Sequence, residues 1–188
     1  MPKFKDVLAG ERVHFGRKST GKGIVAGALG GLIGTIVMTQ FQSAWSSASK
    51  AVKDNKENAK RAERQPSDEE KENATMKLAG KIGGLAGRQL SHQQKSKFAP
   101  LVHYGFGTLQ GGLYGLALER ARRRGGVLPA LIFGASLFAA ADELAVPALG
   151  LSAKPSKSPL SLHLYGLAAH LVYGLATDVG RRGVRGIF

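Results

Sequence analysis

Cysteine is absent from this chain of 188 residues, and tryptophan occurs only once, at Trp45. The lack of cysteine excludes disulfide bonds and thiolate metal sites, and it leaves the redox compartment of the protein undetermined. Acidic residues are scarce, at 13 against 27 lysines and arginines, so that the formal net charge is +14. Charge of either sign is also nearly absent from several long stretches of the chain, and these stretches indicate its class.

Four stretches that are almost free of charge are each long enough to cross a bilayer, which takes about 20 apolar residues in a helix. The averages hide them, because 43% hydrophobic residues and a mean hydropathy of -0.09 would also suit one soluble domain. Residues 43–97 instead hold 12 of the 27 basic and seven of the 13 acidic residues. The pattern predicts an all-α, polytopic membrane protein with amphipathic helices at its surfaces and four transmembrane helices, at 23–41, 98–118, 127–149 and 158–177.

The four spans belong to one predicted membrane domain, and the segments outside them are also predicted to be largely helical. Residues 1–22 form a basic segment that suits a short helix on the membrane surface, and a frayed tail fits equally well. Residues 43–97 are predicted to be a charged extramembrane helical segment, and residues 178–188 a basic tail. The last part of 43–97 is expected to form an interfacial helix that ends near Ser91 and carries Met76, Leu78, Ile82, Leu85 and Leu90.

The first window also fits the apolar core of a cleaved signal peptide, since basic residues precede it and the sequence SAWSSA follows it. Retention as a membrane span is favoured because the window is rich in glycine, the leader would be long, and three more spans follow.

Arginine clusters give the orientation, because short cytoplasmic segments of membrane proteins are enriched in lysine and arginine. With four spans, the basic amino-terminal segment, the turn after the second span and the tail all fall on one side, so both termini are predicted to be cytoplasmic. The arginines expected to contact lipid headgroups and to set the topology are Arg120, Arg122, Arg123, Arg124, Arg181 and Arg182. The lipid bilayer thus accounts for the positive charge, and nucleic acid is not an expected partner.

Glycine recurs at three-residue and four-residue spacing in the first two spans. Membrane helices associate by close packing, and glycine lets two backbones approach each other. We therefore predict that the first span packs through a flat glycine seam, preferably against the second span of the same chain rather than against another subunit. The predicted packing residues are Gly23, Gly27, Gly30, Gly31, Gly34, Gly107, Gly111 and Gly115.

Titratable side chains inside the predicted spans are the most informative residues, because a charge at the bilayer centre costs about 2.5–3.5 kcal/mol on insertion scales. Their depth places two histidines and two carboxylates in the non-cytoplasmic half of the membrane. Asp142 and Glu143 point about 100° apart on a helix, so only one is expected to face the bundle, and Asp142 is the better candidate. The predicted polar cluster consists of His103, Gln110, Asp142, Glu143, His163 and His170.

Three interpretations of this cluster remain open, of which the structural one is favoured. The side chains either satisfy one another's hydrogen bonds and hold the helices in register, or relay protons or ions, or bind a divalent metal. Metal is the weakest of the three because no tight spacing such as HxxxH supports it, and no cofactor is assigned. Catalysis is not expected, since the sequence shows no recognisable pair of nucleophile and base.

The segments 113–119 (LYGLALE) and 172–178 (VYGLATD) are similar, and each ends in an acid that arginines soon follow. Two parallel two-helix halves would explain this, as in some transporters. Convergence on a good membrane exit, in which Glu119 and Asp178 pair with nearby arginines, is the favoured explanation.

The carboxy-terminal half also resembles a known family. One apolar span ends in Pro147 with Gly150 and Leu151, and the next has an Ala-His-Leu-Val core at 169–172 and is closed by Arg181 and Arg182. These elements resemble the YagU-like family of small bacterial inner-membrane proteins. The resemblance implies a location in the bacterial cytoplasmic membrane and supplies no activity.

We therefore expect a multi-pass inner-membrane protein that is not an enzyme. Its expected role is that of a structural or accessory component of the membrane, or of a larger complex with other membrane-protein subunits. The alternative is a small protein that handles protons, ions or a metal through the intramembrane histidines and carboxylates.

Overall fold

The computed structural model describes residues 19–54 and 72–187 of the chain. The surface helix predicted within residues 1–22 and the middle of the charged segment lie mostly outside these described residues. Within them the fold is all-α, as predicted. The elements are α2 (Ser19–Asp54), α3 (Ala74–Leu85), α4 (His92–Arg120), α5 (Val127–Leu137), the π-helix η1 (Phe138–Ala145), α6 (Val146–Ala148), the 3₁₀-helix η2 (Pro155–Lys157) and α7 (Leu160–Ile187).

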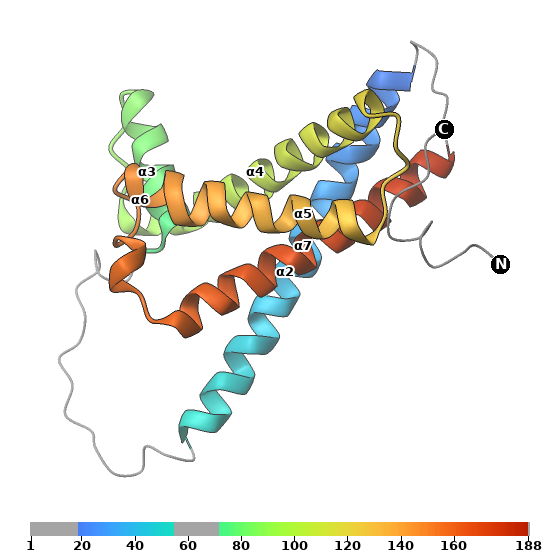
Figure 1. Cartoon of the computed structure of the whole chain (residues 1–188). Coiled ribbons are helices and arrows are strands. Elements are labelled where there is room, and N and C mark those ends of the chain that lie inside the picture. Colours follow the sequence, from blue (N-terminus) through green and yellow to red (C-terminus); the bar gives the residue numbers. More distant parts are fainter. Residues whose placement is uncertain (1–18, 55–71, 188) are drawn as a thin grey trace, which may run out of the picture.

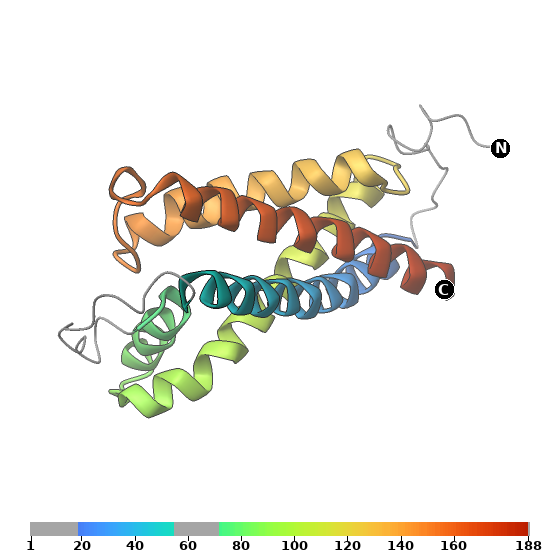
Figure 2. The ribbon, with the colours of Figure 1, turned by 90° about the horizontal axis from the view of Figure 1, so that it is seen from below.

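Four long helical runs pass back and forth between two ends of the molecule (Figure 1 and Figure 2). The start of α2, the end of α4, the start of α5 and the end of α7 gather at one end, here named the basic end because the arginine clusters lie there. The opposite end is named the far end. Helix α2 packs against both α4 and α7, α5 packs against α7, and α3 packs against α4 at the far end.

Two of the described helical runs are long and apolar enough to cross a membrane, namely Thr20–Ser49 and Val127–Ala148. The predicted windows at 98–118 and 158–177 fall within α4 and almost wholly within α7, whose lengths of 29 and 28 residues correspond to about 40 Å each. The helices continue past the windows, α2 to Asp54 and α7 to Ile187. Alanine, lysine and arginine favour helix, so helix formation does not stop where the apolar run stops.

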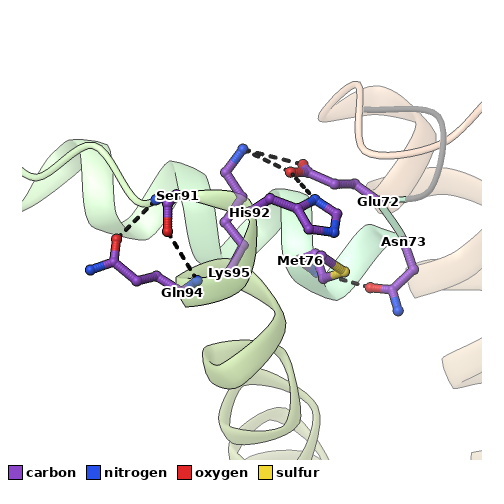
Figure 3. Close-up of polar contacts among 7 residues, drawn as sticks. All are labelled: Glu72, Asn73, Met76, Ser91, His92, Gln94 and Lys95. Atoms are coloured by element: carbon purple, nitrogen blue, oxygen red, sulfur yellow. Dashed lines mark hydrogen bonds and ion pairs between the residues drawn. The ribbon is translucent and has the colours of Figure 1, made fainter. Parts of the chain in front are cut away.

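The expectation of one interfacial helix that ends near Ser91 is wrong, because α3 ends at Leu85 and the next helix, α4, begins at His92, directly after Ser91 (Figure 3). Gly87 turns the chain between them with a φ of 72°, which L side chains rarely adopt. Ser91 then caps α4 in a capping box, in which its hydroxyl accepts from the Gln94 amide and the Gln94 side chain accepts from the Ser91 amide. Asn73 caps α3 by accepting from the Met76 amide at 3.0 Å.

The glycines of α2 lie against two neighbours rather than along one seam. A Cβ atom on Gly27 would overlap the carbonyl oxygen of Gly111 on α4, whereas a Cβ atom on Gly30 or Gly34 would overlap Thr177 on α7. Because these glycines cover a broad sector of the helix, two helices approach the backbone of α2 at once. The other predicted packing residues lie on the side between α2 and α4; they are Gly23, Gly31, Gly107 and Gly115.

Candidate functional site

Two adjoining cavities of about 650 and 410 Å³ lie in the far half of the bundle. Side chains of α2, η1 and α7 line both of them, and α4 closes one side of the larger. The two share Met38, Asp142 and His170 in their walls. Tyr173 and Gly107 also line the larger cavity, and the Tyr173 hydroxyl donates to the Gly107 carbonyl at 2.6 Å. This hydrogen bond and the glycine contacts hold the helices together on the side towards the basic end.

Both carboxylates of η1 contact histidines of α7. Nδ1 of His163 lies 2.7 Å from Oε1 of Glu143, and its Nε2 lies 3.1 Å from the carbonyl oxygen of Pro155. Because a carbonyl only accepts hydrogen bonds, Nε2 must donate to Pro155. The contact between Nδ1 and Oε1 of Glu143 then needs one proton, which lies on one of these two atoms. Nδ1 of His170 donates to the Gly166 carbonyl at 2.9 Å and lies 3.8 Å from Oδ2 of Asp142.

The expectation that only one of the two acids faces the bundle is therefore wrong. Asp142 and Glu143 lie in a π-helix, which turns less per residue than the 100° of an α-helix and so keeps adjacent side chains closer in direction. Their partners, His163 and His170, are seven residues apart, which is two turns along the same side of α7. The local widening of the helix thus brings two successive acids to one neighbour.

His103 lines the larger cavity together with Asp142 and His170, as the prediction of one cluster requires. Its Nε2 is buried and has no hydrogen-bond partner among the described atoms. Gln110, the remaining predicted member, is half-buried on α4 and lines neither of the two cavities. The five titratable residues therefore line the two adjoining cavities of the far half, and Gln110 does not join them.

Polar residues of α2 and α3 complete the larger cavity, and the sequence reasoning missed them. Thr35, Thr39 and Gln42 line it from α2, and Asn73 and Thr75 line it at the start of α3. The three residues of α2 follow one another at spacings of four and three, which is the signature of one helix face. That pattern was available in the sequence inside an otherwise apolar window.

A metal centre finds no support in the geometry. In residues 19–54 and 72–187, no group of three or more His, Asp or Glu side chains is arranged to hold a metal ion. His163 is instead held by Glu143 and the Pro155 carbonyl, and His170 by the Gly166 carbonyl.

A second polar cluster lies at the basic end, and it corrects one assignment. The prediction that Arg181 contacts lipid headgroups is wrong, because its side chain is only 1% exposed. Nη1 of Arg181 donates to the Arg124 carbonyl at 2.8 Å, and Nη2 lies 3.4 Å from Oε1 of Glu119, which is equally buried. Nε of Arg185 lies 3.1 Å from the same carboxylate oxygen. Arg181 follows Thr177 by four residues, so it continues the buried polar face of α7 by one turn.

Asp178 is the other buried acid at the basic end. It accepts from the Tyr114 hydroxyl and from the Gly126 amide, both at 3.0 Å, and Arg182 pairs with it at 2.9 Å. Gly125 and Gly126 have φ values of 101° and 143°, and a Cβ atom on Gly125 would overlap Asp178. Asp178 thereby fixes the turn between α4 and α5. The remaining predicted headgroup arginines lie at the surface or partly so; they are Arg120, Arg122, Arg123, Arg124 and Arg182.

A third polar contact joins the start of α3 to the first turn of α4 (Figure 3). Oε1 of Glu72 lies 3.0 Å from Nζ of Lys95 and 3.4 Å from Nδ1 of His92. The hydrogen bond from Lys95 is the main reason that the pKa of Glu72 lies below its ordinary value. This contact holds the segment from Asn73 to Met76, which forms part of the wall of the larger cavity.

Comparison of the chain with protein-family models, with curated proteins and with solved structures gave no match. What the fold itself defines is an all-α protein with two helical runs that are long and apolar enough to span a membrane. The resemblance of the carboxy-terminal half to the YagU-like family stays a prediction.

Proposed function

We propose that the protein is a four-span integral protein of the bacterial inner membrane with both termini in the cytoplasm. In this proposal it is a non-catalytic structural or accessory component of the membrane or of a larger membrane complex. The alternating direction of the four long helical runs supports this arrangement, since it puts all the arginine clusters at the basic end. The long helices also present large apolar side chains outward, as lipid contact requires; examples are Ile36, Leu109, Ile132 and Leu164.

The close packing of the helices at the basic end is the observation that best supports a structural role. There, glycines bring α2 into backbone contact with both α4 and α7, and Glu119 and Arg181 are buried together. A bundle locked in this way suits a scaffold better than a carrier, because alternating access requires helices to move past one another.

Handling of protons or ions is the second candidate function, and the larger of the two cavities in the far half favours it. Asp142, His103 and His170 line that cavity, and carboxylate and imidazole groups are the usual members of intramembrane proton relays. In this interpretation the Tyr173–Gly107 hydrogen bond is the barrier that a proton would have to pass.

Purification in a mild detergent, followed by reconstitution into liposomes, separates the two candidates. We expect the protein to co-purify with other membrane subunits in a fixed ratio, and to show no proton or cation flux in liposomes. If it instead purifies alone and conducts, and if His103→Ala or Asp142→Ala abolishes the flux, the accessory role is wrong. Gln110→Ala is the matched control, because it removes a polar side chain of the bundle that lines neither cavity.

A further inference from the structure

The walls of the two far-half cavities differ in charge from the rest of the protein. Among their described lining residues there is no lysine or arginine, although the chain has 27 of them and a net charge of +14. Such walls offer no cationic partner to a phosphate or a carboxylate, and a buried anion beside an acid is strongly disfavoured. The cavities therefore discriminate against anions. The acids and histidines on their walls are Asp142, Glu143, His103, His163 and His170.

Two polar groups of the larger cavity are not committed to a partner within hydrogen-bonding distance. The Asp142 side chain is 45% exposed, and its nearest ion-pair partner, Nδ1 of His170, is 3.8 Å away and already donates to Gly166. Nε2 of His103 is buried without a hydrogen-bond partner among the described atoms. Buried polar atoms are nearly always paired, so an unpaired one at a cavity indicates a missing ligand or water. Glu143, by contrast, is held by His163.

One lining residue of the larger cavity also has a backbone acceptor without its helical donor. Pro100 sits inside α4 and has no amide hydrogen, so the carbonyl of Ser96 lacks its regular helical donor. Both residues line the larger cavity. A carboxylate and a carbonyl only accept hydrogen bonds, and Nε2 of His103 accepts one in the tautomer that carries the proton on Nδ1, so a ligand that fits all three must donate.

The rest of the wall is apolar and the space is large. Met38, Phe106, Leu137 and Val146 line the cavity, whose volume of about 650 Å³ lies in the range of pockets for small organic molecules. A bare ion would leave most of this volume unfilled, and the histidines and acids of the described residues form no metal-binding group. The ligand therefore needs an apolar body in addition to its donors.

We infer that the larger cavity binds an organic ammonium ion with an apolar body. The ammonium group, which has donors only, would donate to the Asp142 carboxylate and to Nε2 of His103, while the body packs against the apolar wall. This binding site goes beyond the proposed accessory role and does not depend on it. The same ammonium chemistry occurs in free lipophilic amines and in the headgroup of phosphatidylethanolamine.

Isothermal titration of the purified full-length protein in detergent tests the site with three probes of nearly equal shape. They are 4-phenylbutylamine, the neutral 4-phenylbutanol and the anionic 4-phenylbutyrate. We expect the amine to bind, and the alcohol and the acid to bind at least about tenfold more weakly, because only the amine offers the Asp142 carboxylate a charged hydrogen-bond donor. Asp142→Asn is expected to weaken amine binding by about tenfold or more and to leave alcohol binding unchanged.

Controls separate loss of the site from loss of the fold. Gln110→Ala changes a polar side chain of α4 that lines neither cavity and should leave amine binding unchanged. His103→Leu should weaken amine binding, whereas His103→Gln, which keeps a hydrogen-bond acceptor, should weaken amine binding less. Each variant is compared with the wild type by circular dichroism and gel filtration.

Nanodiscs identify the source of the ammonium group. If amine affinity falls in phosphatidylethanolamine discs relative to phosphatidylcholine discs, whose headgroup has the same net charge but no N–H donor, the lipid headgroup occupies the site; if affinity is equal, the site takes free amines. The proposal is wrong if no probe binds at millimolar concentration, if the alcohol binds as tightly as the amine, or if Asp142→Asn leaves amine affinity unchanged.

Discussion

Replacement of Arg181 by methionine is expected to lower the free energy of unfolding by about 1.5–3 kcal/mol, because the buried Glu119 carboxylate loses its fully buried partner and keeps only the more peripheral contact with Arg185 on α7. Methionine keeps the length and apolar stem of the side chain, so the effect reports mainly on the charge. The Arg124 carbonyl also loses a donor at 2.8 Å. Unfolding of the detergent-solubilised protein by increasing sodium dodecyl sulfate, followed by circular dichroism, measures the change.

Arg182→Met is the matched control, since Arg182 is the next residue on the same helix but its side chain is 49% exposed. Its partner Asp178 is buried but keeps its hydrogen bonds from the Tyr114 hydroxyl and the Gly126 amide, so this variant should lose only about 0–1 kcal/mol, less than Arg181→Met. Combining Arg181→Met with Glu119→Gln should cost less than the sum of the single changes, because both remove the same pair. Equal effects of Arg181→Met and Arg182→Met would show that Arg181 is not buried.

Gly111→Ala is expected to destabilise the bundle by about 1–3 kcal/mol, although alanine is the better helix former. Its methyl group would overlap the carbonyl oxygen of Gly27, so α2 and α4 would have to separate along their whole contact. The same unfolding titration measures the effect. Gly27→Ala should act similarly, and the double variant should cost less than the sum, because one separation accommodates both methyl groups.

Gly105→Ala provides the control on the same helix, because no atom lies within 4 Å of the Cβ position there. Its stability should be unchanged or higher by up to about 1 kcal/mol, as helix propensity predicts. If Gly111→Ala were as harmless as Gly105→Ala, close contact between α2 and α4 would be excluded.

Hydropathy and glycine spacing predicted much of the architecture. The uncharged windows fall in α2, in α4, in the run from α5 to α6 and in α7, and the alternating direction of these helices brings the arginine clusters to one end. The polar face of α7 was also visible, since His163, His170 and Thr177 recur at helical spacing. These features depend on local composition and on the spacing at which residues recur, and both can be read from a single sequence.

The burial of Arg181 and the contacts of both acids in η1 depend on tertiary structure. Arginines near the end of a membrane span usually contact lipid headgroups, which is why this contact was predicted for Arg181. The side of α7 on which Arg181 lies instead faces Glu119. A π-helix has no characteristic composition, so no residue pattern indicated that Asp142 and Glu143 would both reach α7. The cavity likewise depends on how far the helices diverge at the far end, which no local pattern encodes.

The side of the membrane on which each turn lies is the central claim, and the absence of cysteine allows a direct test. Ala121→Cys places a thiol at the exposed turn of the basic end, and Ser152→Cys places one in the exposed loop of the far end. With a membrane-impermeant maleimide on right-side-out vesicles, we expect Ser152→Cys to be labelled at once and Ala121→Cys only after detergent is added. Labelling of both from the same side, or recovery of the protein outside the membrane fraction, would contradict the four-span account.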